Sequence, residues 1–265
     1  MPVKEINLDT TEKVFATLTA AEFDDTLNRD RSPFLFRGLP NVDYRLTTSL
    51  RRNCKEKAPE LELSILRNFS KYAASTSPLN SCWEQMVIGQ HHGLPTRLMD
   101  WTYSPLAALH FATSGEDITG MDQHDAVVWA IDITEMNALL PAKYQEILSK
   151  ERAYLFTIDM LKQVAGDLAT YDSDMGKDSI VLLEPPSIDQ RIINQYSYFS
   201  VIPSGITDIE QFLNEKTMRT VKYILGKEAR WQIRDMLDQC NVNERTVYPG
   251  LDGLASWIKR HYYVR

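Results

Sequence analysis

Two arginines stand where apolar segments end, and their positions suit the binding of a negatively charged ligand. Arg37 follows the apolar run FLF and precedes Gly38, while Arg97 lies within HGLPTRLMDWT. A guanidinium presents its N–H donors in a fork that matches phosphate and carboxylate groups. An arginine among apolar residues needs a specific partner, because a buried unpaired charge is costly. We therefore expect Arg37 and Arg97 to bind phosphate, with Gly38 letting the backbone turn or approach the ligand closely. Pairing with an internal acid such as Asp100 is the alternative.

The chain as a whole is acidic. Its 36 acidic and 29 basic residues give a formal charge of −7 and a pI near 5.3. This net charge repels polyanions and argues against broad nucleic-acid binding, although a local basic cleft remains compatible with one phosphate-rich molecule or a nucleic-acid end. For Arg45, Arg51 and Arg52, pairing with surface acids is the simpler interpretation.

The segment HGLPTRLMDWTYSPLAALHFA predicts a strand that leads into a helix. Glycine and proline end a preceding helix, and residues 96–102 are predicted to be extended. Ser104 is a predicted N-cap, with proline at the first position of a helix of small residues. The strand would bring Asp100 and Thr102 to the mouth of that helix.

The remaining pattern predicts an α+β fold. Residues 34–37, 126–133, 179–186 and 196–203 have the apolar and β-branched composition of strands. Residues 18–29 and most of 209–240 have helical spacing. We expect a mixed β-sheet core with flanking helices and a helical C-terminal part, in a single domain over residues 1–265.

Several common sites are not indicated. The phosphate-loop pattern fails because Val221 stands five residues before Gly226, where a glycine is required. No HExxH occurs, and the adjacent His91 and His92 do not share a helix face, so no metal is expected.

Three well-separated cysteines predict free thiols in a reducing compartment. The first residues lack an apolar targeting segment, and no run approaches the roughly 18 apolar residues of a membrane span. We expect a soluble, cytoplasmic protein without membrane contact.

Four segments resemble the FRG domain family, which is named for a Phe-Arg-Gly signature and occurs largely in bacteria and their mobile elements. They are FLFRGLPNVDYRLTTSLRR, QHHGLPTRLMDWTYSPLAALHFA, RIINQYSYFSVIP and TVYPGLDGLASWIK. The resemblance extends over about residues 34–259.

The order of the motifs also resembles the ADP-ribosyltransferase fold. Arg37 matches an arginine that holds NAD phosphate or ribose in that family, and Thr102, Tyr103 and Ser104 match a motif that supports the nicotinamide pocket. Gln195 lies where the family usually has a glutamate that binds the ribose 2′-hydroxyl and aids transfer.

Gln195 departs from the family pattern. An amide forms hydrogen bonds with ribose hydroxyls, but it neither stabilises a cationic transition state by charge nor removes a proton. The candidate acids in its place are Asp100 and Glu184.

The resemblance implies an NAD-using ADP-ribosyltransferase-like enzyme, of the bacterial toxin or phage-defence kind, that modifies a protein or nucleic-acid acceptor and is controlled by an antitoxin or other regulatory partner. The catalytic candidates are Gln195, Asp100 and Glu184. The NAD-binding candidates are Arg37, Gly38, Arg97, Thr102, Tyr103 and Ser104. A nucleic-acid or nucleotide-recognition module without catalysis is the first alternative, and a nuclease is the second.

Overall fold

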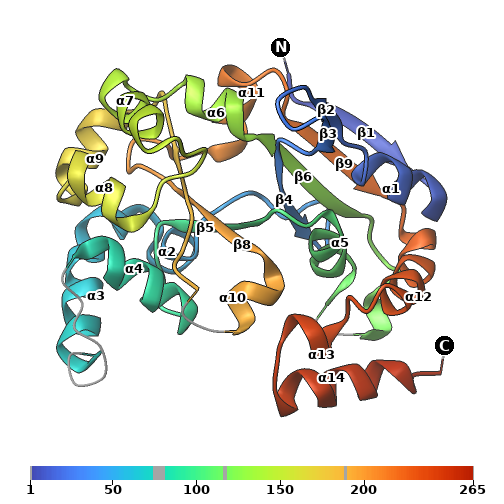
Figure 1. The fold of residues 1–265 in the computed structure, drawn as a ribbon. Coiled ribbons are helices and arrows are strands. Elements are labelled where there is room, and N and C mark those ends of the chain that lie inside the picture. The colour runs from blue at the N-terminus through green and yellow to red at the C-terminus, as the bar shows by residue number, and fades with distance from the viewer. Residues whose placement is uncertain (1, 74–80, 116–117, 188–189, 265) are drawn as a thin grey trace.

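A seven-stranded mixed sheet forms the centre of the computed structural model, which describes residues 2–73, 81–115, 118–187 and 190–264 (Figure 1). The strand order is β1-β9-β6-β4-β5-β8-β7. β1 pairs with β9 in parallel, and the other neighbouring pairs are antiparallel. The strands are β1 (Lys4–Leu8), β4 (Phe34–Leu39), β5 (Leu98–Thr102), β6 (Ala126–Asp132), β7 (Val181–Leu183), β8 (Ser197–Val201) and β9 (Val221–Leu225).

The expected α+β class with a mixed sheet is confirmed. All seven residues of β6 are buried, as its unbroken apolar run predicts for a strand covered on both faces. The described helices are α1 (Thr11–Leu18), α2 (Ser49–Cys54), α3 (Ala58–Ala73), α4 (Cys82–His91), α5 (Pro105–Thr113), α6 (Ile133–Ala138), α7 (Ala142–Glu151), α8 (Ile158–Val164), α9 (Leu168–Met175), α10 (Gln190–Gln195), α11 (Ile209–Lys216), α12 (Arg230–Gln239), α13 (Glu244–Val247) and α14 (Leu251–His261).

Two groups of helices cover one face of the sheet. Leu98 of β5 packs in the cluster formed with α3, α4 and α7–α9, whereas Phe36 of β4 packs in the cluster with α1, α5 and α12. Figure 1 shows these groups at the left and right of the sheet. Phe36 and Thr102 are register partners, so the side chains of Phe36, Asp100 and Leu98 project from the same face. Asp100 therefore lies between the two helical groups.

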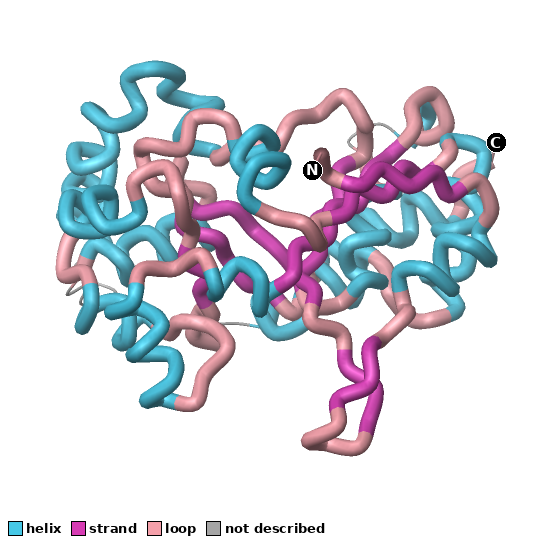
Figure 2. Tube along the Cα trace, turned by 90° about the horizontal axis from the view of Figure 1, so that it is seen from above, coloured by secondary structure: helices cyan, strands magenta, loops and turns pink. Residues whose placement is uncertain are grey.

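One helical prediction is wrong, and the prediction for residues 209–240 is confirmed except over one strand. Residues 18–29 contain only the end of α1, because the chain continues into a hairpin of β2 (Glu22–Asp24) and β3 (Arg29–Arg31) that projects from the body (Figure 2). The C-terminal part is helical except for β9, whose residues pair with both β1 and β6. Its sequence VKYIL favours a strand once two neighbours are available for pairing.

Candidate functional site

Three neighbouring strands bring together the motifs predicted from distant parts of the sequence. Arg37 lies on β4, Thr102 ends β5, and Gln195 ends α10 just before β8. The Thr102 hydroxyl donates a hydrogen bond to the backbone carbonyl of Gln195 at 2.7 Å. The backbone N–H of Ser104 donates to the same hydroxyl at 3.0 Å. We call the region of Arg37, Asp100, Thr102 and Gln195 the strand junction.

Arg37 occupies the place where β4 and β5 separate. Their ladder has a single described pair, Phe36 with Thr102, so the carbonyl of Asp100 needs another donor. Arg37 Nη1 donates to that carbonyl at 2.6 Å and lies 3.7 Å from Asp100 Oδ2. Arg37 thus bridges the two strands.

One edge of the Arg37 guanidinium has no hydrogen-bond partner among the described residues. Nε is buried without a partner, and no residue in the described part of the chain accepts from Nη2. Nε and Nη2 are a pair of parallel donors suited to bidentate binding of an oxyanion. Burial lowers the pKa of Arg37. The charge of Asp100 raises this pKa and that of Arg52 lowers it, and the overall shift is downward. A bound anion would compensate this buried charge.

Asp100 is an accessible carboxylate beside Arg37. Its side chain is 57% exposed, and Gln90 Nε2 lies 3.2 Å from both of its oxygens. Asp100 also contributes, after burial and other charges, to the raised pKa of Tyr248. The guanidinium carbon of Arg191 lies 5.2 Å from the centre of the Tyr248 ring. Gln90 of α4 thus contacts Asp100, while Arg191 of α10 contacts Tyr248.

The expected phosphate contact of Arg97 is wrong. Arg97 Nε donates to Glu62 Oε1 at 2.8 Å, and Nη1 donates to Asp172 Oδ1 at 2.5 Å. Nη2 donates to both carboxylates, and the Arg97 side chain is 7% exposed. Burial lowers the pKa of Arg97, but the bonds to Glu62 and Asp172 outweigh it and raise the pKa overall. Two acids from other parts of the chain therefore occupy its donors.

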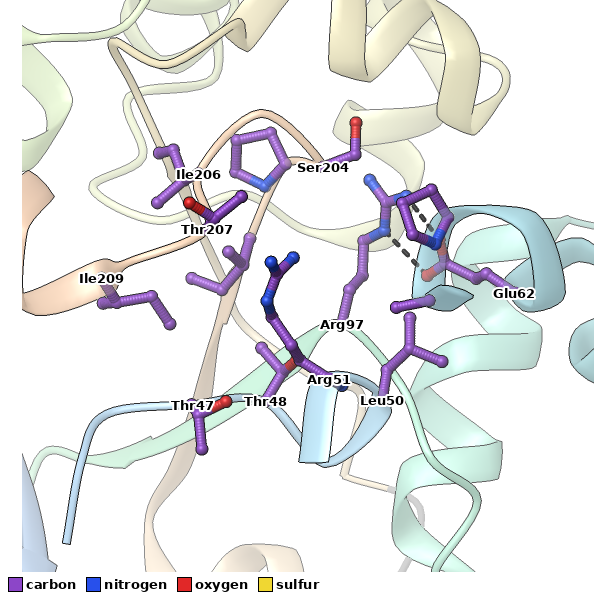
Figure 3. A pocket seen from close by; sticks show the side chains of 14 residues that line it. Thr47, Thr48, Leu50, Arg51, Glu62, Arg97, Ser204, Ile206, Thr207 and Ile209 are labelled. Atoms are coloured by element: carbon purple, nitrogen blue, oxygen red, sulfur yellow. Dashed lines mark hydrogen bonds and ion pairs between the residues drawn. The ribbon is translucent and has the colours of Figure 1, made fainter. Parts of the chain in front are cut away.

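The cavity beside Arg97 is small. Its volume is about 40 Å³, and Arg51 and Ser204 are among its lining residues (Figure 3). This volume suits one or two water molecules rather than a nucleotide. Arg37, Thr102 and Gln195 do not line it, so the two predicted arginines do not share this cavity.

The predicted turn at Gly38 is wrong, and Gly38 lines a cavity of about 490 Å³. Gly38 lies inside β4, in register with Val128, and the backbone of α5 packs directly against it. A Cβ at this position would lie 1.9 Å from the Ala108 carbonyl oxygen and 2.6 Å from the Ala112 nitrogen. Glycine is required at position 38 because the backbone of a helix packs directly against the strand.

Tyr103 lies at a large cavity beyond the strand junction. Its hydroxyl donates to the Ser32 carbonyl at 2.7 Å, and its ring centre lies 5.7 Å from that of Tyr196 and 6.5 Å from that of Tyr198. The three rings line a cavity of about 920 Å³ between the sheet and the β2–β3 hairpin. The prediction missed Tyr196, which directly precedes β8 and has a left-handed backbone, and Tyr198, which lies on β8.

The remaining candidates have separate environments. Ser104 caps α5 by accepting from the Ala107 N–H, and Gln195 Nε2 donates to the Val247 carbonyl at 3.2 Å. Burial raises the pKa of Tyr198 to about 12, with the charge of Glu184 as the next cause, so Glu184 lies near the tyrosines. Of the two candidate acids, Asp100 is the one in contact with Arg37.

Within the described residues, no group of three or more His, Cys, Asp or Glu side chains is arranged to hold a metal ion. No described helix has both the length and the apolar character needed to cross a membrane.

The fold and the site define an α+β protein with a partly unpaired arginine at a junction of three strands. The family model of the FRG domain matches residues 32–119. The match includes β4, β5 and α5, with Arg37, Asp100 and Thr102, whereas Gln195 lies outside it. No curated protein and no solved structure matches the chain.

Proposed function

We propose that this protein is an NAD-using ADP-ribosyltransferase-like enzyme in which Arg37 binds the pyrophosphate of NAD. The unpaired Nε and Nη2 donors of Arg37 are the observation that carries the proposal. Arg97 differs from Arg37, because Glu62 and Asp172 already accept the hydrogen bonds of its guanidinium. A partly buried cation with two free parallel donors favours a doubly charged, oxygen-rich group.

The arrangement of the three motifs supports the same proposal. The Thr102 hydroxyl donates to the Gln195 backbone carbonyl. Tyr103 follows Thr102 and Tyr196 follows Gln195, and the centres of their two rings lie 5.7 Å apart. Under the proposal Gln195 binds a ribose hydroxyl, and Tyr103 provides a ring face for nicotinamide.

The transfer itself needs a negative charge near the reacting ribose. The bond between the ribose C1′ and nicotinamide breaks, its electron pair leaves with nicotinamide, and an acceptor nucleophile forms the new bond to C1′. We assign to Asp100 the stabilisation of the cationic transition state and the uptake of the acceptor proton, because it is the exposed carboxylate beside Arg37.

The proposal extends to the biological setting. The enzyme would act in the cytoplasm as a toxin or phage-defence effector on a macromolecular acceptor, under the control of a regulatory partner. The free Cys54, Cys82 and Cys240 are compatible with a reducing compartment.

The test combines NAD binding with nicotinamide release. The protein is incubated with labelled NAD and a cell lysate, and released nicotinamide and labelled acceptor are measured. Arg37→Lys keeps the charge but removes the fork, so NAD binding should weaken about 10–100-fold. Asp100→Asn should lower nicotinamide release while NAD binding is kept.

Arg45→Lys is the matched control, because Arg45 is 64% exposed and pairs with Asp208 at the surface. It should leave both measurements unchanged. Absence of NAD binding by calorimetry, together with absence of nicotinamide release, would refute the proposal.

Nucleotide recognition without transfer is the second candidate function. Two features of Gln195 favour it. The residue is an amide where the resemblance implies glutamate, and its side-chain Nε2 already donates to the Val247 carbonyl. NAD or oligonucleotide binding that requires Arg37, with no nicotinamide release, would favour this function over the enzyme.

A further inference from the structure

His110 of α5 is a buried side chain whose tautomer follows from its neighbour. His110 is fully buried, and its Nδ1 lies 2.8 Å from Arg234 Nη1. An arginine has donors only, so Nδ1 must be the acceptor in this bond. Burial, followed by the charges of Arg234 and Arg260, holds the pKa of His110 well below its ordinary value. The ring is therefore neutral, and its proton lies on Nε2.

The Nε2–H group of His110 has no acceptor among the residues that the structure describes. A buried donor without a partner is disfavoured, and such groups in proteins are usually satisfied by a water molecule or a ligand. The acceptor that is missing must come from outside the described chain.

His110 lines a cavity of about 490 Å³ between α5, α13 and α14. This volume lies in the range of small-molecule sites. Phe111 and Tyr248 supply aromatic walls, with ring centres 6.4 Å apart and planes at 78°. Ser114 and Ser256 add hydroxyl groups to the lining. The cavity thus combines ring surfaces with hydrogen-bonding groups.

The charges around the cavity favour an anion. Arg260 is bound by Glu244 and Asp238, and Arg234 is bound by Glu244, so these buried charges compensate one another. Lys259 also lines the cavity, is exposed, and has no ion pair with a described residue. Among the described residues, the uncompensated charge at the cavity is therefore positive.

We propose that this cavity binds a small organic anion that carries an aromatic ring. The ring packs against Phe111 and Tyr248, an acceptor atom of the ligand receives the His110 Nε2–H bond, and the anionic group lies beside Lys259. Nucleoside monophosphates and aromatic carboxylates share this chemistry. The site goes beyond the proposed NAD reaction, because its donors differ from those of the strand junction.

The test follows the His110 ring by NMR during ligand titration. A long-range ¹H–¹⁵N spectrum assigns the tautomer, and His110→Gln identifies the resonance among the five histidines. AMP, benzoate and inorganic phosphate are added separately. AMP or benzoate should shift the Nε2 resonance, and inorganic phosphate at the same concentration should have little effect. A response to AMP alone identifies a nucleotide site, and a response to benzoate alone identifies an aromatic-acid site.

Lys259→Gln should weaken binding of the responding ligand about fivefold, as expected for one exposed charge. Lys150→Gln, at an exposed position on α7, is the matched control and should have no effect. Arg37→Gln should also leave this binding unchanged.

Three outcomes would overturn the proposal. The first is a His110 resonance that responds to neither AMP nor benzoate, which would leave water as the acceptor. The second is equal binding of inorganic phosphate, since the aromatic walls would then play no part. The third is loss of AMP binding in Arg37→Gln, which would assign the nucleotide to the strand junction.

Discussion

Replacing Gly38 with alanine distinguishes a glycine needed for packing from a glycine needed for ligand binding. The added Cβ would lie 1.9 Å from the Ala108 carbonyl oxygen, about 1.5 Å closer than ordinary van der Waals contact, which begins at 3.4 Å. The obstacle is backbone rather than a flexible side chain, so α5 must move away from β4. Overpacking of this kind typically costs 1–3 kcal/mol, and we expect about 3 kcal/mol here.

The assay is thermal unfolding followed by circular dichroism. For a chain of this size, about 3 kcal/mol corresponds to a decrease in Tm of roughly 6–12 °C. Gly166→Ala is the matched control, because nothing lies within 4 Å of its added Cβ, and its Tm should change little. Loss of ligand binding by Gly38→Ala with an unchanged Tm would refute the packing argument and restore a direct ligand role for Gly38.

Two further predictions concern the buried ion pairs. Glu62→Gln should destabilise the protein by about 3 kcal/mol in chemical denaturation, because it leaves Arg97 with one carboxylate. Glu56→Gln is the control, because the Glu56 side chain is 90% exposed, and it should leave the denaturation midpoint unchanged. Equal effects of the two variants would contradict the buried pairing of Glu62 with Arg97. The pKa of Glu244 is lowered from 4.5 because its bonds to Arg260 and Arg234 outweigh burial. The stability contributed by Glu244 is therefore present above pH 4.5 and lost as pH falls through the lower folded value. Tm measured from pH 6 to pH 3 should show this loss, and the same acid limb in Glu244→Gln would refute its assignment to Glu244.

The prediction of the site succeeded where a strand and a helix follow each other directly in the sequence. The extended segment that ends at Thr102 and the cap at Ser104 form as their local residues indicate. Thr102 and Gln195, which are far apart in the sequence, meet through a hydrogen bond to the Gln195 backbone carbonyl, while their roles stay a prediction. Roles for Tyr196 and Tyr198 were missed, because nothing in the local sequence shows that β8 lies beside β5.

The sequence by itself determined the α+β class, the main strands and the presence of an FRG signature, since these depend on local composition and short-range spacing. Only the tertiary structure distinguished the two arginines. Arg37 and Arg97 have similar local settings, yet Glu62 and Asp172 occupy the donors of Arg97, while one edge of Arg37 has no hydrogen-bond partner among the described residues. The partners of a buried charge come from segments distant in the chain, so its availability for a ligand is decided by packing rather than by neighbouring residues.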